Sequence, residues 1–379
     1  MRPLCRSAIL PILIGVIAVC NSTALVAAAP ATSPFPPATV SAIDAAIAKW
    51  FTQYKAPGVI VGIWIPRKGT FVAARGTADR STGAPMEVDD HMRIGSVTKT
   101  FTITVLLQLV DQKRLGLDDP ISKYVSYVPN GRHTTLRMLA NMTAGLFNYT
   151  EDNGFNEEVA RNPQRLWTPR ELVHVGLRHH PYFDPGTGWH YSNTNTVLLG
   201  IAIESVLQKP IASIFQRYSF APLRLTNTGW PASGALPAPY ARGITEVHGK
   251  IVDATHWSPS QAFTAGELVS SLRDLKVWVK ASATGAQISP GLQKQRLKWV
   301  TLSPVTPDHT YGLGIAYNHG WLGHNGSIPG YTSEVDYLPS QDATLVLLVN
   351  SDIPVGTASP IAALFHALTQ IVTPANVAK

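Results

Sequence analysis

The sequence predicts an α+β fold: an antiparallel sheet built from both ends of the chain and flanked by helices, with a mostly helical region inserted between the two sets of strands. Two observations predict it. Apolar, β-rich runs lie near residue 60 and again beyond residue 310, and helical patterns alternate with Pro- and Gly-rich loops in the long stretch between them. A cleft between the sheet and the helical region is the expected place for a binding site.

The folded domain is expected over residues 41–372, after a flexible leader over residues 32–40 that is rich in Pro, Ala, Ser and Thr. Ser41–Tyr54 carries apolar residues at helical spacing behind a serine cap, which predicts a helix. Pro57–Pro66 is a β-rich run, and after a Lys-Gly turn Thr70–Ala74 completes a hairpin.

The rest of the chain follows the same plan. A helix behind Ser96 opens the helical region, and Thr194–Leu207 is its clearest later helix. Ser359–Ile371 closes the chain as a helix. Four strands precede that helix and complete the sheet, the last of them almost wholly apolar and therefore central: Tyr311–Tyr317, Gly320–His324, Tyr331–Leu338 and Ala343–Val349.

The first residues predict a secretory signal peptide over residues 1–31. Arg2 and Arg6 precede an apolar stretch, Ala8–Val19, which is followed by Ala- and Pro-rich sequence. The apolar stretch is too short for a comfortable membrane span. We therefore expect a secreted or cell-envelope protein.

Both cysteines, Cys5 and Cys20, lie inside that segment, so a cleaved chain would have no disulfide. Lipidation is an alternative, because Ile17-Ala18-Val19-Cys20 resembles a bacterial lipobox. Val19 stands where Gly, Ala or Ser is usual, so simple cleavage ranks first. Contact with a membrane is expected only if Cys20 is lipidated.

The distribution of charge argues against a nucleic-acid partner, and the spacing of the histidines argues against a bound metal. The net charge of +7 comes from scattered Lys and Arg residues without a long basic run, so nucleic acid is not an expected partner. His174, His179 and His180 are clustered, but without a metal-ligand spacing such as H-E-x-x-H. We expect no metal and no cofactor.

Ser96 and Lys99 form an S-x-x-K motif at the head of a helical run. One helical turn places the two side chains on one face, about 5–6 Å apart, and Ile103, Leu106 and Val110 continue that face toward the core. A serine needs a base to become a nucleophile, and a lysine carried into the core has a lowered pKa and can be that base. A serine cap with a lysine that reaches solvent is the alternative.

Two further motifs carry polar residues that chemistry could use. In Tyr191-Ser192-Asn193, a tyrosine can pass a proton if a nearby cation lowers its pKa, and the asparagine can hold an amide. The alternative is a packing aromatic followed by a helix cap at Asn193 or Asn195. In His324-Asn325-Gly326, the glycine lets a substrate lie close to a strand edge. Its alternatives are a structural histidine and a hairpin turn at Asn325-Gly326.

In this order the three motifs resemble those of the serine β-lactamase and penicillin-binding-protein superfamily, closest to D-alanyl-D-alanine carboxypeptidases and class C β-lactamase relatives. The resemblance covers residues 41–372 and implies the β-lactamase/transpeptidase-like fold. Other segments familiar in that superfamily extend it: Arg93-Ile94-Gly95, Leu115–Pro120, Thr143–Phe147, Tyr311–Gly314 and Pro329–Tyr331.

The resemblance implies a role for each residue of the reacting centre. Ser96 would be the acylated nucleophile and Lys99 its proton partner. Tyr191 would carry a proton to the leaving group and help to activate the water that removes the acyl group. Either Lys99 or Tyr191 could be the primary base, because enzymes of this kind differ on that point.

The resemblance also implies the residues that bind the substrate. Asn193 would hold the substrate amide, and His324, which replaces a common lysine, would bind a substrate carboxylate or tune the tyrosine. Asn325 and Gly326 would lie along the substrate. The backbone N–H groups of Ser327 and of the nucleophile would form the oxyanion hole. Asn325 stands where Thr or Ser is common, so a hydroxyl often used for the carboxylate is missing.

The predicted function is an exported serine hydrolase that works through an acyl-enzyme on Ser96, first of all a D-alanyl-D-alanine carboxypeptidase-like peptidase. An esterase, a weak β-lactamase and a catalytically silent, penicillin-binding-like envelope protein are the alternatives, since fold does not fix function. The expected partner is a small peptide, amide or ester, with peptidoglycan fragments and β-lactams among the candidates.

Overall fold

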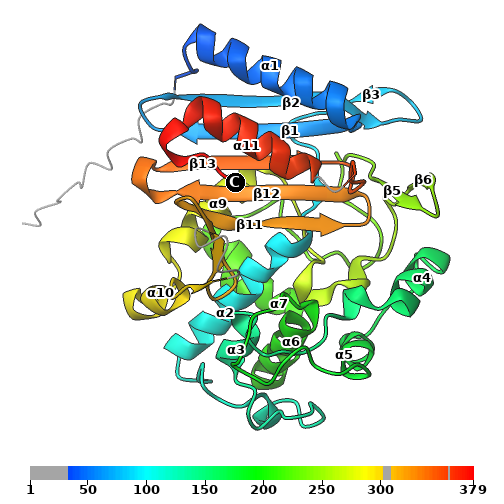
Figure 1. The fold of residues 1–379 in the computed structure, drawn as a ribbon, viewed down its shortest axis with the longest axis vertical. Coiled ribbons are helices and arrows are strands. Elements are labelled where there is room, and N and C mark those ends of the chain that lie inside the picture. Colours follow the sequence, from blue (N-terminus) through cyan, green and yellow to red (C-terminus); the bar gives the residue numbers. More distant parts are fainter. Residues whose placement is uncertain (1–32, 302–308, 357–358) are drawn as a thin grey trace, which may run out of the picture. The chain divides into compact units, whose positions relative to one another are not determined.

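A computed structural model describes residues 33–301, 309–356 and 359–379, and its centre is an antiparallel sheet (Figure 1). The described strands of this sheet follow the order β3-β2-β1-β13-β12-β11-β10-β9-β8. The first strands therefore pair with the last, β1 with β13, and the predicted α+β fold class is confirmed. The bounds are β1 Gly58–Ile65, β2 Gly69–Asp79, β3 Ala84–Pro85, β8 Val300–Thr301, β9 His309–Tyr311, β10 Ala316–Asn318, β11 Trp321–Ile328, β12 Tyr331–Leu338 and β13 Ala343–Val349.

Helices cover both faces of the sheet. α1 (Pro37–Tyr54) and α11 (Pro360–Val372) pack on one face, where they meet alternate residues of β1 such as Val59 and Val61 (Figure 1). α9 (Leu272–Thr284) packs on the other face, against β12 and β13. All eight residues of β1 are buried, because a strand covered on both faces loses the alternation of buried and exposed residues.

The inserted region is mostly helical, as predicted. Many of its helices start at side-chain caps: at α5, Thr168 accepts the backbone N–H of Glu171, and Glu171 accepts the backbone N–H of Thr168. Two small two-stranded sheets accompany the helices: the hairpin β5-β6, and β4-β7, which joins distant parts of the chain. The remaining elements are β4 Met92–Arg93, α2 Thr98–Asp111, α3 Leu136–Ala140, α4 Asn153–Arg161, α5 Pro169–Leu177, α6 Asn193–Leu207, α7 Ile211–Phe215, α8 Ala221–Leu223, β5 Ile244–Val247, β6 Lys250–Asp253, β7 Val269–Ser270 and α10 Pro290–Arg296.

α2 lies in the middle of the core and is buried on every side, not only on the predicted face. Phe101 stacks on Trp278 of α9 with 3.6 Å between ring centres. The polar side of the helix is satisfied by equally buried partners: Trp278 Nε1 donates to Thr100 Oγ1 at 2.7 Å, and Arg296 Nη2 donates to Thr104 Oγ1. A helix in this position can hold Ser96 and Lys99 rigidly.

The N-terminal end of the fold differs from the prediction. α1 begins at Pro37, not at Ser41, and Phe35 is buried in the core beneath it, so residues 33–40 are part of the fold and the flexible leader is wrong for them. A proline suits the first turn of a helix because its missing N–H would have no partner there. The predicted signal peptide, with Cys20, lies outside the described residues.

The predicted strand over Tyr311–Tyr317 is also wrong in part. The chain forms two short strands, β9 and β10, joined by a turn in which Gly314 has a φ of +65°. Among the described helices, none alone is long and apolar enough to cross a membrane; the bent pair Asn193–Leu207 and Ile211–Leu223 reaches that measure only when its two parts are combined.

β11 passes directly against the turn that carries Ser96. A Cβ on Gly326 would lie 2.0 Å from the carbonyl oxygen of Ile94, so only glycine fits at this point of the strand. Ser333 on the neighbouring strand donates to the same carbonyl at 2.9 Å. The sheet is thereby attached to the start of α2.

We expect Gly326→Ala to lower the free energy of unfolding by about 1–3 kcal/mol, because the added methyl group overpacks this contact. Gly229→Ala is the matched control, since a Cβ there meets no atom within 4 Å and its φ is not positive. Urea unfolding followed by circular dichroism measures both. Equal stability of the two variants would contradict the close contact between β11 and the Ser96 turn.

Candidate active site

Ser96 lies where a short 3₁₀ turn, Gly95–Val97, runs into α2. Lys99 follows one turn later, and its Nζ lies 2.9 Å from Ser96 Oγ. Lys99 is completely buried, whereas Ser96 is half-buried and lines a cavity. The two side chains therefore face each other as predicted, and the alternative in which the lysine reaches solvent is wrong.

Three oxygen atoms surround the nitrogen of Lys99. They are Ser96 Oγ at 2.9 Å, Asn193 Oδ1 at 2.6 Å and the carbonyl oxygen of Ala265 at 2.7 Å. Burial lowers the pKa of Lys99 well below its usual 10.5. The oxygens of Asn193 and Ala265 can only accept, so a neutral amine gives them its two hydrogens and keeps its lone pair for the Ser96 hydroxyl.

Asn193, the first residue of α6, holds Lys99 in place. Its Nδ2 donates to Asn148 Oδ1 at 3.2 Å and to Thr150 Oγ1 at 3.0 Å. The two hydrogens of Nδ2 are thus used within the protein, whereas Oδ1, which accepts from Lys99, has a second lone pair for an N–H of the expected substrate amide. Neither Asn193 nor the buried Asn195 caps α6. No motif indicated Asn148, although it directly follows the Thr143–Phe147 segment.

Tyr191 lies above Lys99, whose Nζ is 4.9 Å from the centre of the tyrosine ring. The buried Tyr191 hydroxyl makes no hydrogen bond of ordinary geometry, although Ser96 is near enough to lower its pKa slightly. Burial outweighs that contact and raises the pKa of Tyr191 above its usual 10. The condition that a nearby cation lowers this pKa is therefore not met. At neutral pH Tyr191 keeps its proton and can donate it.

His324 is a buried, neutral residue on β11. Its Nδ1 contacts the carbonyl oxygen of Asn325, and its Nε2 lies 3.0 Å from Tyr311 Oη. Because a carbonyl only accepts, these partners assign the hydrogen to Nδ1 and leave Nε2 as the acceptor. Burial, together with the nearby Lys99, lowers the pKa of His324 to about 3. It therefore offers no positive charge to a substrate carboxylate. Its ring centre lies 6.1 Å from that of Tyr191, close enough to influence the pKa of the tyrosine.

The other β11 residues bring the strand edge to Ser96. β11 continues through Asn325 and Gly326, so the alternative of a hairpin turn at this point is wrong. A Cβ on Gly95 would lie 2.7 Å from the backbone nitrogen of Ser327, which places the Ser327 amide beside the nucleophile. Asn325 and Ser327 are both exposed.

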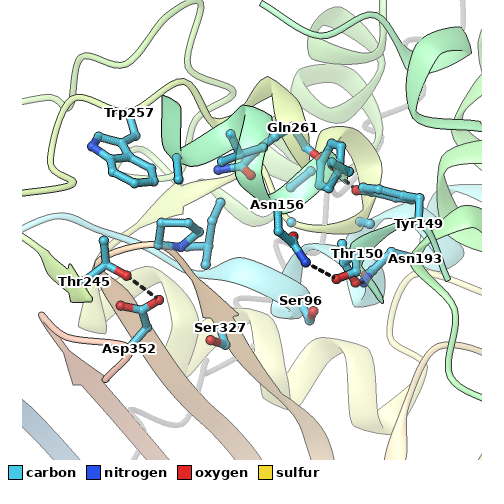
Figure 2. Close-up of a pocket in the computed structure, with 18 of the residues that line it drawn as sticks. Ser96, Tyr149, Thr150, Asn156, Asn193, Thr245, Trp257, Gln261, Ser327 and Asp352 are labelled. Carbon is cyan, nitrogen blue, oxygen red and sulfur yellow. Dashed lines mark hydrogen bonds between the residues drawn. The ribbon is translucent and has the colours of Figure 1, made fainter. Parts of the chain in front are cut away.

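A cavity of about 320 Å³ opens in front of Ser96. Figure 2 shows Ser96 and Asn193 on one side of it and Thr245 and Asp352 on the other. Asp352 accepts hydrogen bonds from Thr245 Oγ1 and from the Gly330 amide, each at 3.1 Å, and burial raises its pKa to about 6. Apolar and aromatic side chains form about half of the walls: Tyr149, Phe155, Val159, Trp257, Ile328 and Pro329.

The lining of this cavity lacks positive charge. Among the described residues no Lys, Arg or His lines it, whereas Glu246 and Asp352 do. Apart from Pro329, which lies in the Pro329–Tyr331 segment, no sequence motif indicated these wall residues, because they come from separate helices, strands and loops that only the fold brings together.

The predicted site residues therefore gather in one region around two cavities. Ser96, Asn193 and Ser327 line the first, and a second cavity of about 300 Å³ is lined by Tyr191, His324 and Asn325. Lys99 and Gly326 are buried behind them. The histidine cluster lies elsewhere: His179 Nε2 contacts Asp152 Oδ2 at 2.7 Å, and its ring stacks on Phe147.

The fold and this arrangement define a serine hydrolase of the β-lactamase/transpeptidase type. The sequence matches the Beta-lactamase family over residues 40–368, and the chain belongs to that family. The resemblance inferred from the three motifs is thereby confirmed. A curated relative, a beta-lactamase of Lysobacter lactamgenus, is 24% identical over 367 residues, covering 84% of this chain and 90% of the relative.

Similar solved structures include two amide hydrolases. A D-stereospecific amidohydrolase from a Streptomyces species is 30% identical, with a TM-score of 0.78 and coverage of 89% of this chain and 98% of that one. The D-amino acid amidase of Ochrobactrum anthropi SV3 is 26% identical, with a TM-score of 0.76 and coverage of 88% and 99%. Both share the fold across nearly their whole length.

Proposed function

We propose that this protein hydrolyses amide or ester bonds through an acyl-enzyme on Ser96, with Lys99 as the base. One observation carries the proposal: the buried Lys99 nitrogen has two partners that only accept and a third, Ser96 Oγ, at 2.9 Å. A neutral lysine in this setting has its lone pair aimed at the hydroxyl it must deprotonate.

The steps follow from the positions of the groups. Ser96 Oγ attacks the substrate carbonyl carbon and its proton passes to Lys99 Nζ. The backbone N–H groups of Ser96 and Ser327 receive the negative oxygen; a donor of this kind is typically worth about 10²–10³ in rate. The bond to the leaving group breaks as Tyr191 gives it a proton and recovers one from Lys99. Water then attacks the ester on Ser96 by the same path in reverse.

For the substrate, we propose an amide or ester without a free carboxylate beside the bond that is cut. Carboxypeptidases and β-lactamases must hold a carboxylate, and here His324 is neutral while Asn325 lacks a hydroxyl. The described lining of the Ser96 cavity also includes two acidic residues, Glu246 and Asp352. Such a site repels an anion. Likeness to a D-stereospecific amidohydrolase and a D-amino acid amidase supports the same choice.

A carboxypeptidase acting on D-alanyl-D-alanine is the second candidate. The order of the S-x-x-K, Y-S-N and H-x-G motifs favours it, and so does the relative named as a beta-lactamase. It requires a cation for the terminal carboxylate, and Lys379 is the one lysine or arginine that lines either cavity within the described residues.

We further propose that the protein is exported. The support is the Arg2–Arg6 start, the apolar stretch Ala8–Val19 and the Ala-rich sequence after it. Mass spectrometry of the protein recovered from the producing bacterium should give a chain that starts close to residues 29–32. A mature N-terminus at a lipid-modified Cys20 would show that the protein is a lipoprotein, in place of simple cleavage. An intact Met1 would contradict export.

Replacing Ser96 by alanine should lower kcat by about 10³-fold or more, because no other group can form the acyl-enzyme. Activity is measured on D-alaninamide, on a D-alanine ester and on a D-alanyl-D-alanine peptide; Ser81→Ala, on an exposed turn, is the control. We expect the amide and ester to be cut faster than the peptide. Undiminished hydrolysis by Ser96→Ala would remove the mechanism, and a preference for the peptide would restore the carboxypeptidase.

The rate should depend on pH through Lys99. Since burial lowers the pKa of Lys99, kcat/KM should rise as Lys99 loses its proton and become level well below pH 10.5. Lys99→Arg keeps a cation that cannot release its proton, so its rate should fall by about 10²–10⁴. A limb that rises only near pH 10 or above would contradict the lowered pKa of Lys99 and its role as the neutral base.

A further inference from the structure

The second cavity surrounds an open edge of β11. β10 pairs with β11 only as far as Gly323, so His324 and Asn325 lie beyond the last pairing on that side. The cavity has a volume of about 300 Å³. Trp189 and Tyr191 line it on the side of the reacting centre. Two carboxyl groups of β12, Glu334 and Asp336, line it from the face of the sheet that α11 covers, where Ala362 and Phe365 of α11 also line it.

Glu334 and Asp336 are alternate residues of one strand, so their side chains share a face. They are only 9% and 5% exposed. Asp336 extends over Gly323 of β11, where a Cβ would lie 2.5 Å from Asp336 Oδ1. A glycine at this position of β11 therefore makes room for a carboxyl group at the cavity.

The pair holds a negative charge that lacks a partner. Burial raises the pKa of both groups, and the two neighbouring carboxyl groups share one proton, so the pair carries one negative charge between them. Asp336 Oδ2 is buried and has no hydrogen-bond partner in the structure. A buried charged oxygen without a donor is costly, which a ligand with N–H groups would relieve.

Further buried polar atoms on the same cavity also lack partners. They are Trp189 Nε1, Tyr191 Oη and Thr310 Oγ1. Buried polar groups normally have partners, so a concentration of unpaired ones around one cavity indicates a polar ligand. The cations at hand do not neutralise the pair: His324 is neutral, and exposed Lys379 forms no ion pair with either carboxyl group in the described part of the chain.

We propose that this cavity binds the leaving-group end of the substrate and that Glu334 and Asp336 select an end that carries a positively charged nitrogen. The assignment rests on the proposed function, in which Tyr191 protonates the leaving atom: Tyr191 lines this cavity, whereas Ser96 and Asn193 line the other. The substrate class is then an amide whose leaving amine bears a second, cationic amino group, such as the amide of a diamine.

Binding of small probes tests the subsite without catalysis. The probes are butylammonium, butyramide and butanoate, added to Ser96→Ala, with the indole N–H signal of Trp189 as the readout; Trp189→Phe assigns that signal. We expect butylammonium to bind about tenfold more tightly than butanoate, and the ratio to fall below about threefold in Asp336→Asn. Asp352→Asn, which removes a carboxylate from the other cavity, should leave the ratio at Trp189 unchanged.

Two results would overturn the subsite. One is an equal response of the Trp189 signal to the cation and the anion. The other is a preference for the cation that emerges only in Lys379→Met, which would show that Lys379 itself occupies the place of the ligand. A response confined to the indole of Trp257, which lines the first cavity, would move the cation site there and would equally contradict the proposal.

Hydrolysis separates this proposal from the proposed function. The substrates are D-alanyl amides of 1,4-diaminobutane, butylamine and 4-aminobutanoate, and we expect kcat/KM to fall in that order, about tenfold from first to last. Equal rates that all depend on Ser96 would reject the subsite and keep the amidase. If none of the amides is hydrolysed and a fluorophosphonate does not label Ser96, the amidase function is rejected. The binding ratio measured at Trp189 would then be the only test of the subsite.

Discussion

The burial of one lysine is the constraint on which the rest of the site depends. Lys99 is carried into the interior by a helix that is buried on every side, and removal from water lowers its pKa. Its partners come from three parts of the chain: Ser96 on its own turn, Asn193 at the start of α6, and the carbonyl group of Ala265. The reacting centre therefore exists only when the helical region is packed against α2.

A second constraint joins this centre to the sheet. Gly326 lets β11 approach the carbonyl oxygen of Ile94, and the Ser327 amide comes to lie beside the turn of Ser96. The same strand presents His324, which burial keeps neutral. In the proposed mechanism, helix and strand thus contribute complementary parts: the helix supplies the nucleophile with its base, and the strand supplies backbone donors and an uncharged edge.

The charge around the reacting centre supports the proposal of a substrate without a free carboxylate. Its curated relatives include a beta-lactamase, and its structural neighbours include a D-stereospecific amidohydrolase and a D-amino acid amidase. The nucleophile and base are compatible with either chemistry. Asp352 in one cavity and Asp336 in the other place negative charge where a carboxylate-binding enzyme needs positive charge. Selectivity on this fold can therefore change without any change in the S-x-x-K pair.

Local patterns determined much of this protein from the sequence alone. The strands over Tyr331–Leu338 and Ala343–Val349 have the predicted bounds, and the S-x-x-K spacing placed Ser96 and Lys99 face to face. Periodicity and helical spacing act over a few residues, so a single sequence expresses them. The charge of His324 and the unpaired carboxylate of Asp336 were decided only by the tertiary structure. Both depend on burial and on partners supplied by distant segments, and such desolvation has no local signature.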